Sequence, residues 1–561
     1  MKAKILIVTV FFSVLFSCKK EEITKNKIQK KPNIIFIMAD DHTTQGFGIY
    51  GSRLASLNPT PNLDKIAKEG IIFNNCFVNN SICTPSRAAI LTGQHSQANG
   101  VLDLEGVLPK EKQYLPLEIK KLGYQTALIG KWHLTNQPNF DYYNILTHMH
   151  QQGTYFDPWL TETGMSYALW KDKGYEGKQY KGHSTDVITD LTLDWLEKKR
   201  DTEKPFMLMY HLKAPHDNFQ YAPRYKNYLE DTFIPEPESL YDNKNNGSIA
   251  TRGKNDSLIH IIGSSISKRH HIRNYSELMW NEKLMERSNP DFNKNDYIND
   301  NMTDRELTSA TYQEYIKRYL RCVKGVDDNV ARVIKYLKEN DLYDNTIIVY
   351  TGDQGFMLGE HDYMDKRWMY DESMRMPFFV RYPETIKPNT TTDAIINNTD
   401  FAPTLIEMAG GKVPSKMQGH SFKSILETGK EPENWQQSTY YRYWMHMAHQ
   451  HSNPAHFGIR TKKHKLIFYY GKYWVDTDNP DAEWNKNSWG NDFTNHTPAA
   501  WELYDLEKDP KEMNNVYNNP AYKNIVAELK TELKNKRAEL NEEDGEKYSH
   551  IQKVIDAHWN D

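Results

Sequence analysis

The sequence predicts an α/β fold in which a large, mainly parallel sheet is flanked by helices, followed by a smaller C-terminal α+β region with an antiparallel sheet. Two observations predict it. Short apolar runs rich in β-branched residues alternate with segments whose apolar residues recur every three or four positions, a pattern typical of parallel sheets covered by helices. Beyond about residue 425, aromatic-rich runs of strand character follow one another, which indicates a second, antiparallel sheet.

Four apolar runs are expected to form buried parallel strands, and each ends in polar or charged residues. Because the carboxyl edge of such a sheet is where α/β proteins bind ligands, we expect these polar residues to meet in one active site. Residues 33–39 lead to Asp40 and Asp41, residues 126–130 to Lys131 and His133, residues 206–210 to His216, and residues 346–351 to Asp353 and Gln354.

The helices are predicted from apolar spacing. The clearest covers residues 316–337, with others expected over 62–69 and 520–540. Cys76 and Cys322 are interpreted as small core residues. Residues 217–305 are rich in Asn, Lys, Asp and Ser and are expected to form a long insertion near the mouth of the site.

The expected organisation has four parts. Residues 1–17 are a signal peptide, 18–31 a flexible tether, 32–425 the main domain, and 426–561 the C-terminal α+β subdomain. With strands expected at 440–444 and within 457–470, this last part differs in character from the rest.

Composition excludes several classes of protein. The 561 residues include 38% hydrophobic residues, enough for a large buried core. With 70 basic and 74 acidic residues the net charge is −4, so no basic excess points to a nucleic-acid partner. Four cysteines are too few for a disulfide framework in a chain of this length.

The N-terminus has the pattern of an export signal. Lys2 and Lys4 precede an apolar run too short to span a bilayer, which ends in Leu-Phe-Ser-Cys18. This end resembles a bacterial lipobox, which implies lipidation of Cys18. The following Lys-Lys-Glu-Glu resembles the tag of surface lipoproteins. We therefore expect an outer-membrane lipoprotein at the cell surface, held to the membrane through its lipid, with a periplasm-facing location as the alternative.

Cys83 carries the main chemical signal. It lies in Cys83-Thr-Pro-Ser-Arg87, followed by Ala-Ala-Ile-Leu-Thr-Gly. Proline suits the first turn of a helix, so Cys83 is expected at a helix N-terminus, where free N–H groups favour an anion. This position indicates a reactive cysteine; the alternative is a buried inert one.

The segment Cys83–Arg87 resembles the Cys-x-Pro-Ser-Arg motif of formylglycine-dependent sulfatases, and six further segments match that family in order. They are Asn33–Asp41, Thr60–Asp64, Gly130–His133, Ala214–His216, Thr351–Gly355, and Gly359-Glu-His361 through Lys366. The resemblance implies the alkaline-phosphatase-like fold and hydrolysis of a sulfate ester.

The family's chemistry can be carried over to the matching positions. The resemblance implies that a sulfatase-maturating enzyme oxidises Cys83 to formylglycine (3-oxoalanine), whose hydrated aldehyde supplies the nucleophile. It also implies a divalent cation on Asp40, Asp41, residue 83, Asp353 and Gln354. An all-oxygen set favours Ca²⁺, although the family usually has Asn or His where this chain has Gln354.

The remaining roles are also implied by the resemblance. Arg87, Lys131 and Lys366 would stabilise the charge that develops in the transition state. His133 would accept a proton when sulfate leaves, and His216 would donate one to the departing sugar oxygen.

The substrate is expected to be a sulfated poly- or oligosaccharide, either an algal polysaccharide such as ulvan or carrageenan or a glycosaminoglycan. Candidate sugar-binding residues come from loops and from the C-terminal region: Trp159, His361, Arg367, His446 and Arg460. Two alternatives stay open. One is a phosphoester or phosphonate hydrolase of the same superfamily, and the other is an inactive glycan-binding lipoprotein.

Overall fold

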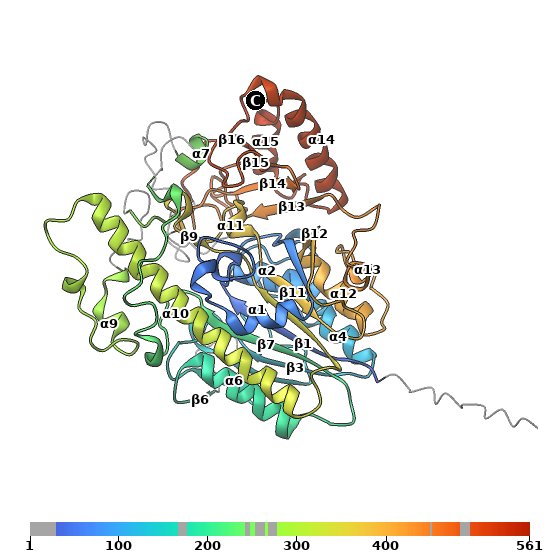
Figure 1. Ribbon diagram of the computed structural model, residues 1–561. Coiled ribbons are helices and arrows are strands. Elements are labelled where there is room, and N and C mark those ends of the chain that lie inside the picture. Colours follow the sequence, from blue (N-terminus) through green and yellow to red (C-terminus); the bar gives the residue numbers. More distant parts are fainter. Residues whose placement is uncertain are drawn as a thin grey trace, which may run out of the picture. The chain divides into compact units, whose positions relative to one another are not determined.

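A computed structural model describes residues 30–166, 177–241, 247–252, 264–267, 278–448, 451–482 and 494–561. The chain divides into Met1–Lys31 and Pro32–Asp561, and the fold below is that of the second unit (Figure 1). The predicted signal peptide and Cys18 lie outside the described residues. Among the described helices, none combines the length and apolarity needed to cross a membrane.

A ten-stranded sheet forms the centre of this unit. Its middle strands β8, β1, β7, β3 and β4 are mutually parallel neighbours, whereas β11, β5 and β6 pair antiparallel. The predicted mainly parallel sheet is therefore confirmed. The strands in spatial order are β12 (Thr390–Asn397), β2 (Ile71–Phe77), β11 (Phe378–Arg381), β8 (Thr346–Gly352), β1 (Asn33–Asp40), β7 (Phe206–Pro215), β3 (Gln125–Gly130), β4 (Tyr142–Leu146), β5 (Trp159–Glu162) and β6 (Lys178–Gln179).

Helices cover both faces of the sheet because its strands are apolar on both sides. Along β1, Ile34, Phe36 and Met38 pack in one core cluster, whereas Ile35 and Ile37 pack in the other. The first cluster includes residues of α2 (Cys83–Thr92), α4 (Tyr114–Lys121) and α12 (Phe401–Met408). The second includes residues of α1 (Pro61–Lys68), α6 (Ser184–Asp194) and the 36-residue α10 (Asp304–Glu339).

The helix α10 begins at a capping box. Thr303 and Glu306 each accept a hydrogen bond from the other's backbone N–H, which satisfies two donors at the helix start. The helix starts twelve residues before the predicted range 316–337. The sequence did not predict its first three turns, because they contain few apolar residues at helical spacing. Figure 1 shows α10 alongside α6.

The C-terminal region contains the predicted antiparallel sheet, with strands β13 (Ser438–Tyr443), β14 (His456–Thr461), β15 (His464–Tyr469) and β16 (Ala500–Asp505) in that order. Helices α13 (Lys423–Thr428), α14 (Lys523–Glu539) and α15 (Ser549–His558) also belong to this half of the chain. The predicted helix over 520–540 is therefore present, while β16 and α15 had no sequence prediction.

The expected insertion, residues 217–305, is described in part. Up to the start of α10 at Asp304, its described residues form short elements, among them α7 (Ile249–Arg252) and α9 (Glu282–Met285). Ser264 and Ser265 contact the segment that carries Lys366: the Met364 N–H donates to the Ser264 carbonyl, and the Ser265 hydroxyl donates to Asp362.

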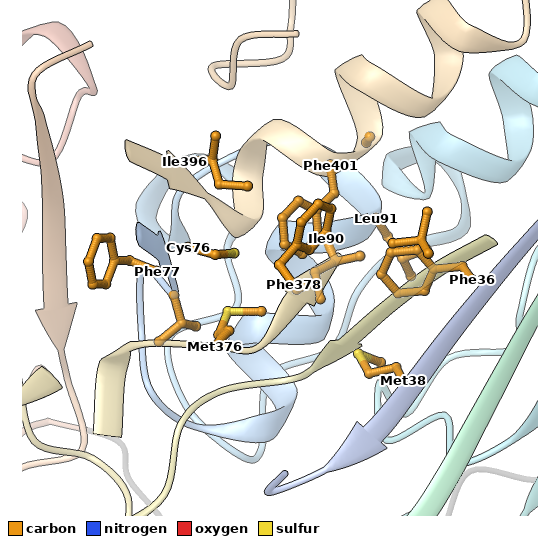
Figure 2. Packing of buried hydrophobic residues seen from close by; sticks show 14 of the residues in the cluster. Phe36, Met38, Cys76, Phe77, Ile90, Leu91, Met376, Phe378, Ile396 and Phe401 are labelled. Carbon is orange, nitrogen blue, oxygen red and sulfur yellow. The ribbon is translucent and has the colours of Figure 1, made fainter. Parts of the chain in front are cut away.

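The first core cluster predicts a stability effect. Figure 2 shows Phe401 between Phe378 and Phe36, with ring centroids 4.6 and 6.1 Å away, respectively, and its side chain is 1% exposed. We expect Phe401→Ala to lower the free energy of unfolding by about 3–5 kcal/mol, because it removes buried area and leaves a cavity. Urea denaturation measures this.

The matched control is Phe233→Ala, since Phe233 is 67% exposed. That substitution should change the free energy of unfolding by less than about 0.5 kcal/mol. Equal losses in the two variants would contradict the packing described for Phe401.

Candidate active site

Four neighbouring strands deliver the predicted polar residues to one edge of the sheet. In the pairing register, Ala39 of β1 lies opposite both Leu212 of β7 and Gly352 of β8, and Gly130 of β3 lies opposite His211 of β7. The residues that follow these positions therefore leave the sheet side by side. They include the predicted Asp40, Asp41, Lys131, His133, His216, Asp353 and Gln354.

Cys83 is the first residue of α2, as predicted, and it is buried. The helix is held in place through Ser86, whose hydroxyl donates to the Asp353 carbonyl and accepts from the Asn398 amide at 3.0 Å. The Lys366 ammonium lies 3.3 Å from the Cys83 sulfur. The sulfur also lies within 4.8 Å of ligating atoms of Asp40 and His216.

The thiol of Cys83 is not activated in its encoded form. Burial, together with the nearby Asp40 carboxylate, raises its pKa far above the ordinary value. The structure therefore does not support the prediction of a cysteine with a lowered pKa, because burial and the carboxylate of Asp40 disfavour the thiolate.

Three carboxylates, those of Asp40, Asp41 and Asp353, have oxygens within 4.8 Å of one another. Each is also paired with a buried cation. Arg87 lies 2.9 Å from Asp353 and 3.4 Å from Asp40, Lys131 pairs with Asp40, and Lys366 lies 2.5 Å from Asp41.

The crowding of these carboxylates changes their pKa values. Burial and the adjacent Asp40 raise the pKa of Asp353 to about 7. Burial also acts to raise the pKa of Asp40, but the Lys131 ammonium, His216 and Arg87 hold it well below its usual range. Three buried cations face the three carboxylates, and a metal ion bound directly by the carboxylate oxygens would further favour their ionised forms.

The chemistry of these donors fits a divalent cation. Within the described residues, Asp41 Oδ2 and Gln354 Oε1 are buried and accept no hydrogen bond, although such oxygens normally have a partner. The Gln354 amide nitrogen donates to Asp41 Oδ1, so the longer arm of Gln354 still places its amide beside the cluster. An all-oxygen set of this kind suits Ca²⁺ or Mg²⁺ rather than Zn²⁺.

The two predicted histidines occupy different surroundings. His216 Nδ1 lies 2.9 Å from Asp217, and its Nε2 faces Asp41 Oδ2 at 3.8 Å. His133 is buried, and burial together with Lys131 and Arg87 holds its pKa well below the ordinary value. His133 is therefore neutral near pH 7 and able to accept a proton.

Three residues of this site have strained backbone conformations. Asp41, His133 and Arg367 have φ values of 64°, 58° and 90°, a region that residues with a side chain rarely adopt. Such conformations cost roughly 1–3 kcal/mol each and cluster where function fixes the geometry.

Arg367 also lies beside the site, on the residue after Lys366. Its Nε lies 2.9 Å from Asp365, which in turn lies 3.2 Å from His451. Burial acts to raise the pKa of Asp365, but His451, Arg367 and Lys366 lower it strongly. This group of three polar residues adjoins the cations of the reaction centre.

The other predicted sugar-binding residues have contacts elsewhere. Trp159 is in β5, separated from β1 by three strands. His446 binds the Asn495 carbonyl and the Ala455 N–H, and Arg460 pairs with Asp371. His361 is buried and stacks on Tyr370 with ring centroids 4.7 Å apart.

Sequence reasoning missed several residues that the structure places at the site. Tyr319 donates a hydrogen bond to the Asp41 carbonyl and accepts one from the Thr43 N–H. Lys213, on β7, is buried near Lys131, Asp40 and Asp41. The one signal in the sequence for Lys213 was a charged residue within an apolar strand.

Comparison with known proteins agrees with this geometry. The family model described as Sulfatase matches residues 32–411, and the model described as N-sulphoglucosamine sulphohydrolase, C-terminal, matches residues 359–485 and 492–539. An N-acetylglucosamine-6-O-sulfatase of Bacteroides thetaiotaomicron is 39% identical, over 89% of this chain and 85% of its own length. An ulvan-active sulfatase of Formosa agariphila is 27% identical, over 90% of this chain and 79% of its own length.

A solved structure agrees as well. It shows a protein in complex with its substrate, D-glucosamine-2-N,6-O-disulfate, and it is 38% identical to this chain with a TM-score of 0.77. The match covers 92% of this chain and 99% of the other. The Cys-x-Pro-Ser-Arg segment, the convergent strand ends and the two family models lead to one conclusion: the chain belongs to the sulfatase family and is a sulfatase enzyme.

Proposed function

We propose that this sulfatase removes the 6-O-sulfate group from glucosamine residues of a sulfated saccharide, with residue 83 in the formylglycine form and one bound Ca²⁺. The observation that carries the proposal is the position of Cys83, at the start of α2 and among Asp40, Lys366 and His216. The sugar is proposed because the relative at 39% identity is an N-acetylglucosamine-6-O-sulfatase and the solved structure at 38% identity contains D-glucosamine-2-N,6-O-disulfate as substrate.

The formylglycine proposal rests on the surroundings of Cys83. A thiol whose pKa is raised by burial and by Asp40 is a poor nucleophile at neutral pH. Oxidation by a maturation enzyme would replace this thiol with a hydrated aldehyde, whose hydroxyl group attacks sulfur. Lys366, 3.3 Å from the sulfur of the encoded residue, is placed to stabilise the negative charge of such a hydroxyl.

The cation would be held by Asp40, Asp41, Asp353, Gln354 and the modified residue 83. When bound, it would polarise the sulfate group and favour ionisation of the nucleophile. Arg87 and Lys131, which the cluster already fixes, would orient the sulfate oxygens and stabilise charge in the transition state.

The histidines would divide the proton transfers. His216 is oriented through Asp217 and presents Nε2 to the site, so it is placed to protonate the departing sugar oxygen. His133 is neutral because burial lowers its pKa, so it can take a proton from residue 83 as sulfate is released. Arg367, with Asp365 beside it, is proposed to bind sugar hydroxyl groups next to the sulfate.

The site of action is proposed to be the outer surface of a bacterial cell, where lipidation of Cys18 would anchor the enzyme. The export-type N-terminus and the lipobox-like segment around Cys18 support this. A lipid-anchored sulfatase at that location would meet polymeric sulfated saccharides.

The substrate proposal predicts a selective release of sulfate. Enzyme produced together with a maturation enzyme should release sulfate from 6-O-sulfated N-acetylglucosamine at least about tenfold faster than from the 3-O-sulfated isomer, since only one sulfate position can reach residue 83 when the sugar is bound by Arg367. Ion chromatography measures the released sulfate.

The matched control for this assay is Cys83→Ala, which should abolish turnover while the protein still binds the sugar, because an alanine side chain cannot be oxidised to the aldehyde. Retained turnover in Cys83→Ala would rule out the formylglycine mechanism. Faster turnover of ulvan fragments than of the glucosamine sulfate would contradict the proposed sugar. Faster turnover of an aryl phosphate than of an aryl sulfate would contradict the proposal that the enzyme acts on sulfate esters.

His216→Gln tests the proton donor. We expect the rate on a sugar sulfate to fall by roughly 10²–10⁴-fold, because a sugar alkoxide leaves only with a proton. The rate on 4-nitrophenyl sulfate should fall much less, because nitrophenolate leaves without one. Steady-state kinetics on both substrates give the comparison, and equal losses on the two would show that His216 has another role.

A further inference from the structure

Lys213 lies in an irregular part of β7, close to the reaction centre. Strand β7 is buried along its whole length. Its pairing with β1 is interrupted there: Leu212 lies opposite Ala39 and Pro215 opposite Asp40, so that Lys213 and Ala214 have no partner on β1. Bulges of this kind often redirect a side chain beside an active site.

The ammonium group of Lys213 is buried without an ionic partner. The residue is 4% exposed. Its ammonium group makes a cation–π contact with Tyr155, with Nζ 5.0 Å from the ring centroid. The Nζ of Lys213 forms no ion pair and no hydrogen bond with the described part of the chain, while the Lys213 backbone carbonyl accepts a hydrogen bond from the His216 N–H at 3.2 Å. By contrast, Arg87, Lys131 and Lys366 each contact a carboxylate.

A buried ammonium ion without an ion-pair partner is costly. Burial, which is the larger cause, and the nearby Lys131 ammonium lower the pKa of Lys213 to about 8, while Asp40, Asp217 and Asp41 act in the opposite direction. Two neighbouring ammonium groups in a buried site repel each other, and an anion that binds to both of them offsets this repulsion. Lys213 is also connected to His216, the proposed proton donor. Its ammonium contacts the Tyr155 ring, and the Tyr155 hydroxyl donates to the His216 carbonyl.

We propose that Lys213 binds an oxygen of the sulfate group, so that the substrate's sulfate supplies the counter-charge that this lysine lacks in the protein. A sulfate monoester carries one negative charge spread over three oxygens, and Lys213 and Lys131 would share it. This role concerns the sulfate and not the sugar, so it rests on the sulfatase chemistry and is independent of which saccharide is attached.

Binding of inorganic sulfate to the full-length, Ca²⁺-loaded protein tests the proposal by isothermal titration calorimetry. We expect Lys213→Met to raise the Kd for sulfate at least about tenfold. Lys213→Gln keeps a polar side chain and should show the same loss, so it answers the question if Lys213→Met does not fold. The control is Lys198→Met, since the side chain of Lys198 is 65% exposed, and it should leave the Kd unchanged.

A Kd within twofold of the native value in either folded variant would overturn the proposal. So would a native protein that binds no sulfate, or a variant that loses affinity for sulfate and for neutral N-acetylglucosamine equally, since that would indicate a collapsed site. A native protein that binds sulfate through Lys213 but leaves glucosamine 6-sulfate intact would contradict only the proposed sugar.

Discussion

Three carboxylates, those of Asp40, Asp41 and Asp353, lie together in the interior of the protein, and their mutual repulsion is the constraint on which the rest of the site depends. Buried charges are tolerated only when other charges and hydrogen bonds compensate them. Arg87, Lys131 and Lys366 provide this compensation, while burial and the adjacent Asp40 raise the pKa of Asp353 to about 7. A cation bound by the carboxylate oxygens would favour the ionised form of Asp353.

The fold meets this constraint by joining distant parts of the sequence. Asp40 and Asp41 follow β1, Asp353 follows β8, Lys131 follows β3, and the N-terminus of α2 brings Cys83 and Arg87. Parallel strands make this possible because their carboxyl ends share one edge. Lys213 lies near the same edge and has no carboxylate partner among the described residues. The site therefore suits an anion as well as a metal ion.

Much of this arrangement could be predicted from the sequence, because strand ends rich in polar residues are a local signal. The four central strands and the residues that follow them were found in this way. Other strands of the sheet were not predicted: β11, which lies beside β8, and β5 are four residues long, too short for a periodic pattern. The partners of His446 and Arg460, which are Asn495 and Asp371, lie far away in the sequence and could not be predicted from it, and the role of these two residues in sugar binding stays a prediction. The role of Lys213 was missed because the neighbouring sequence does not show whether a lysine has a carboxylate partner in the folded protein.

The central claim is that this carboxylate cluster, loaded with a cation, hydrolyses a sulfate ester. The most direct test is the rate of sulfate release from 6-O-sulfated N-acetylglucosamine by one preparation of enzyme before chelation of divalent metal, after chelation, and after Ca²⁺ is returned. The account predicts that the rate falls to background on chelation and recovers with one equivalent of Ca²⁺ per chain. An unchanged rate in the chelated, metal-free protein would contradict it.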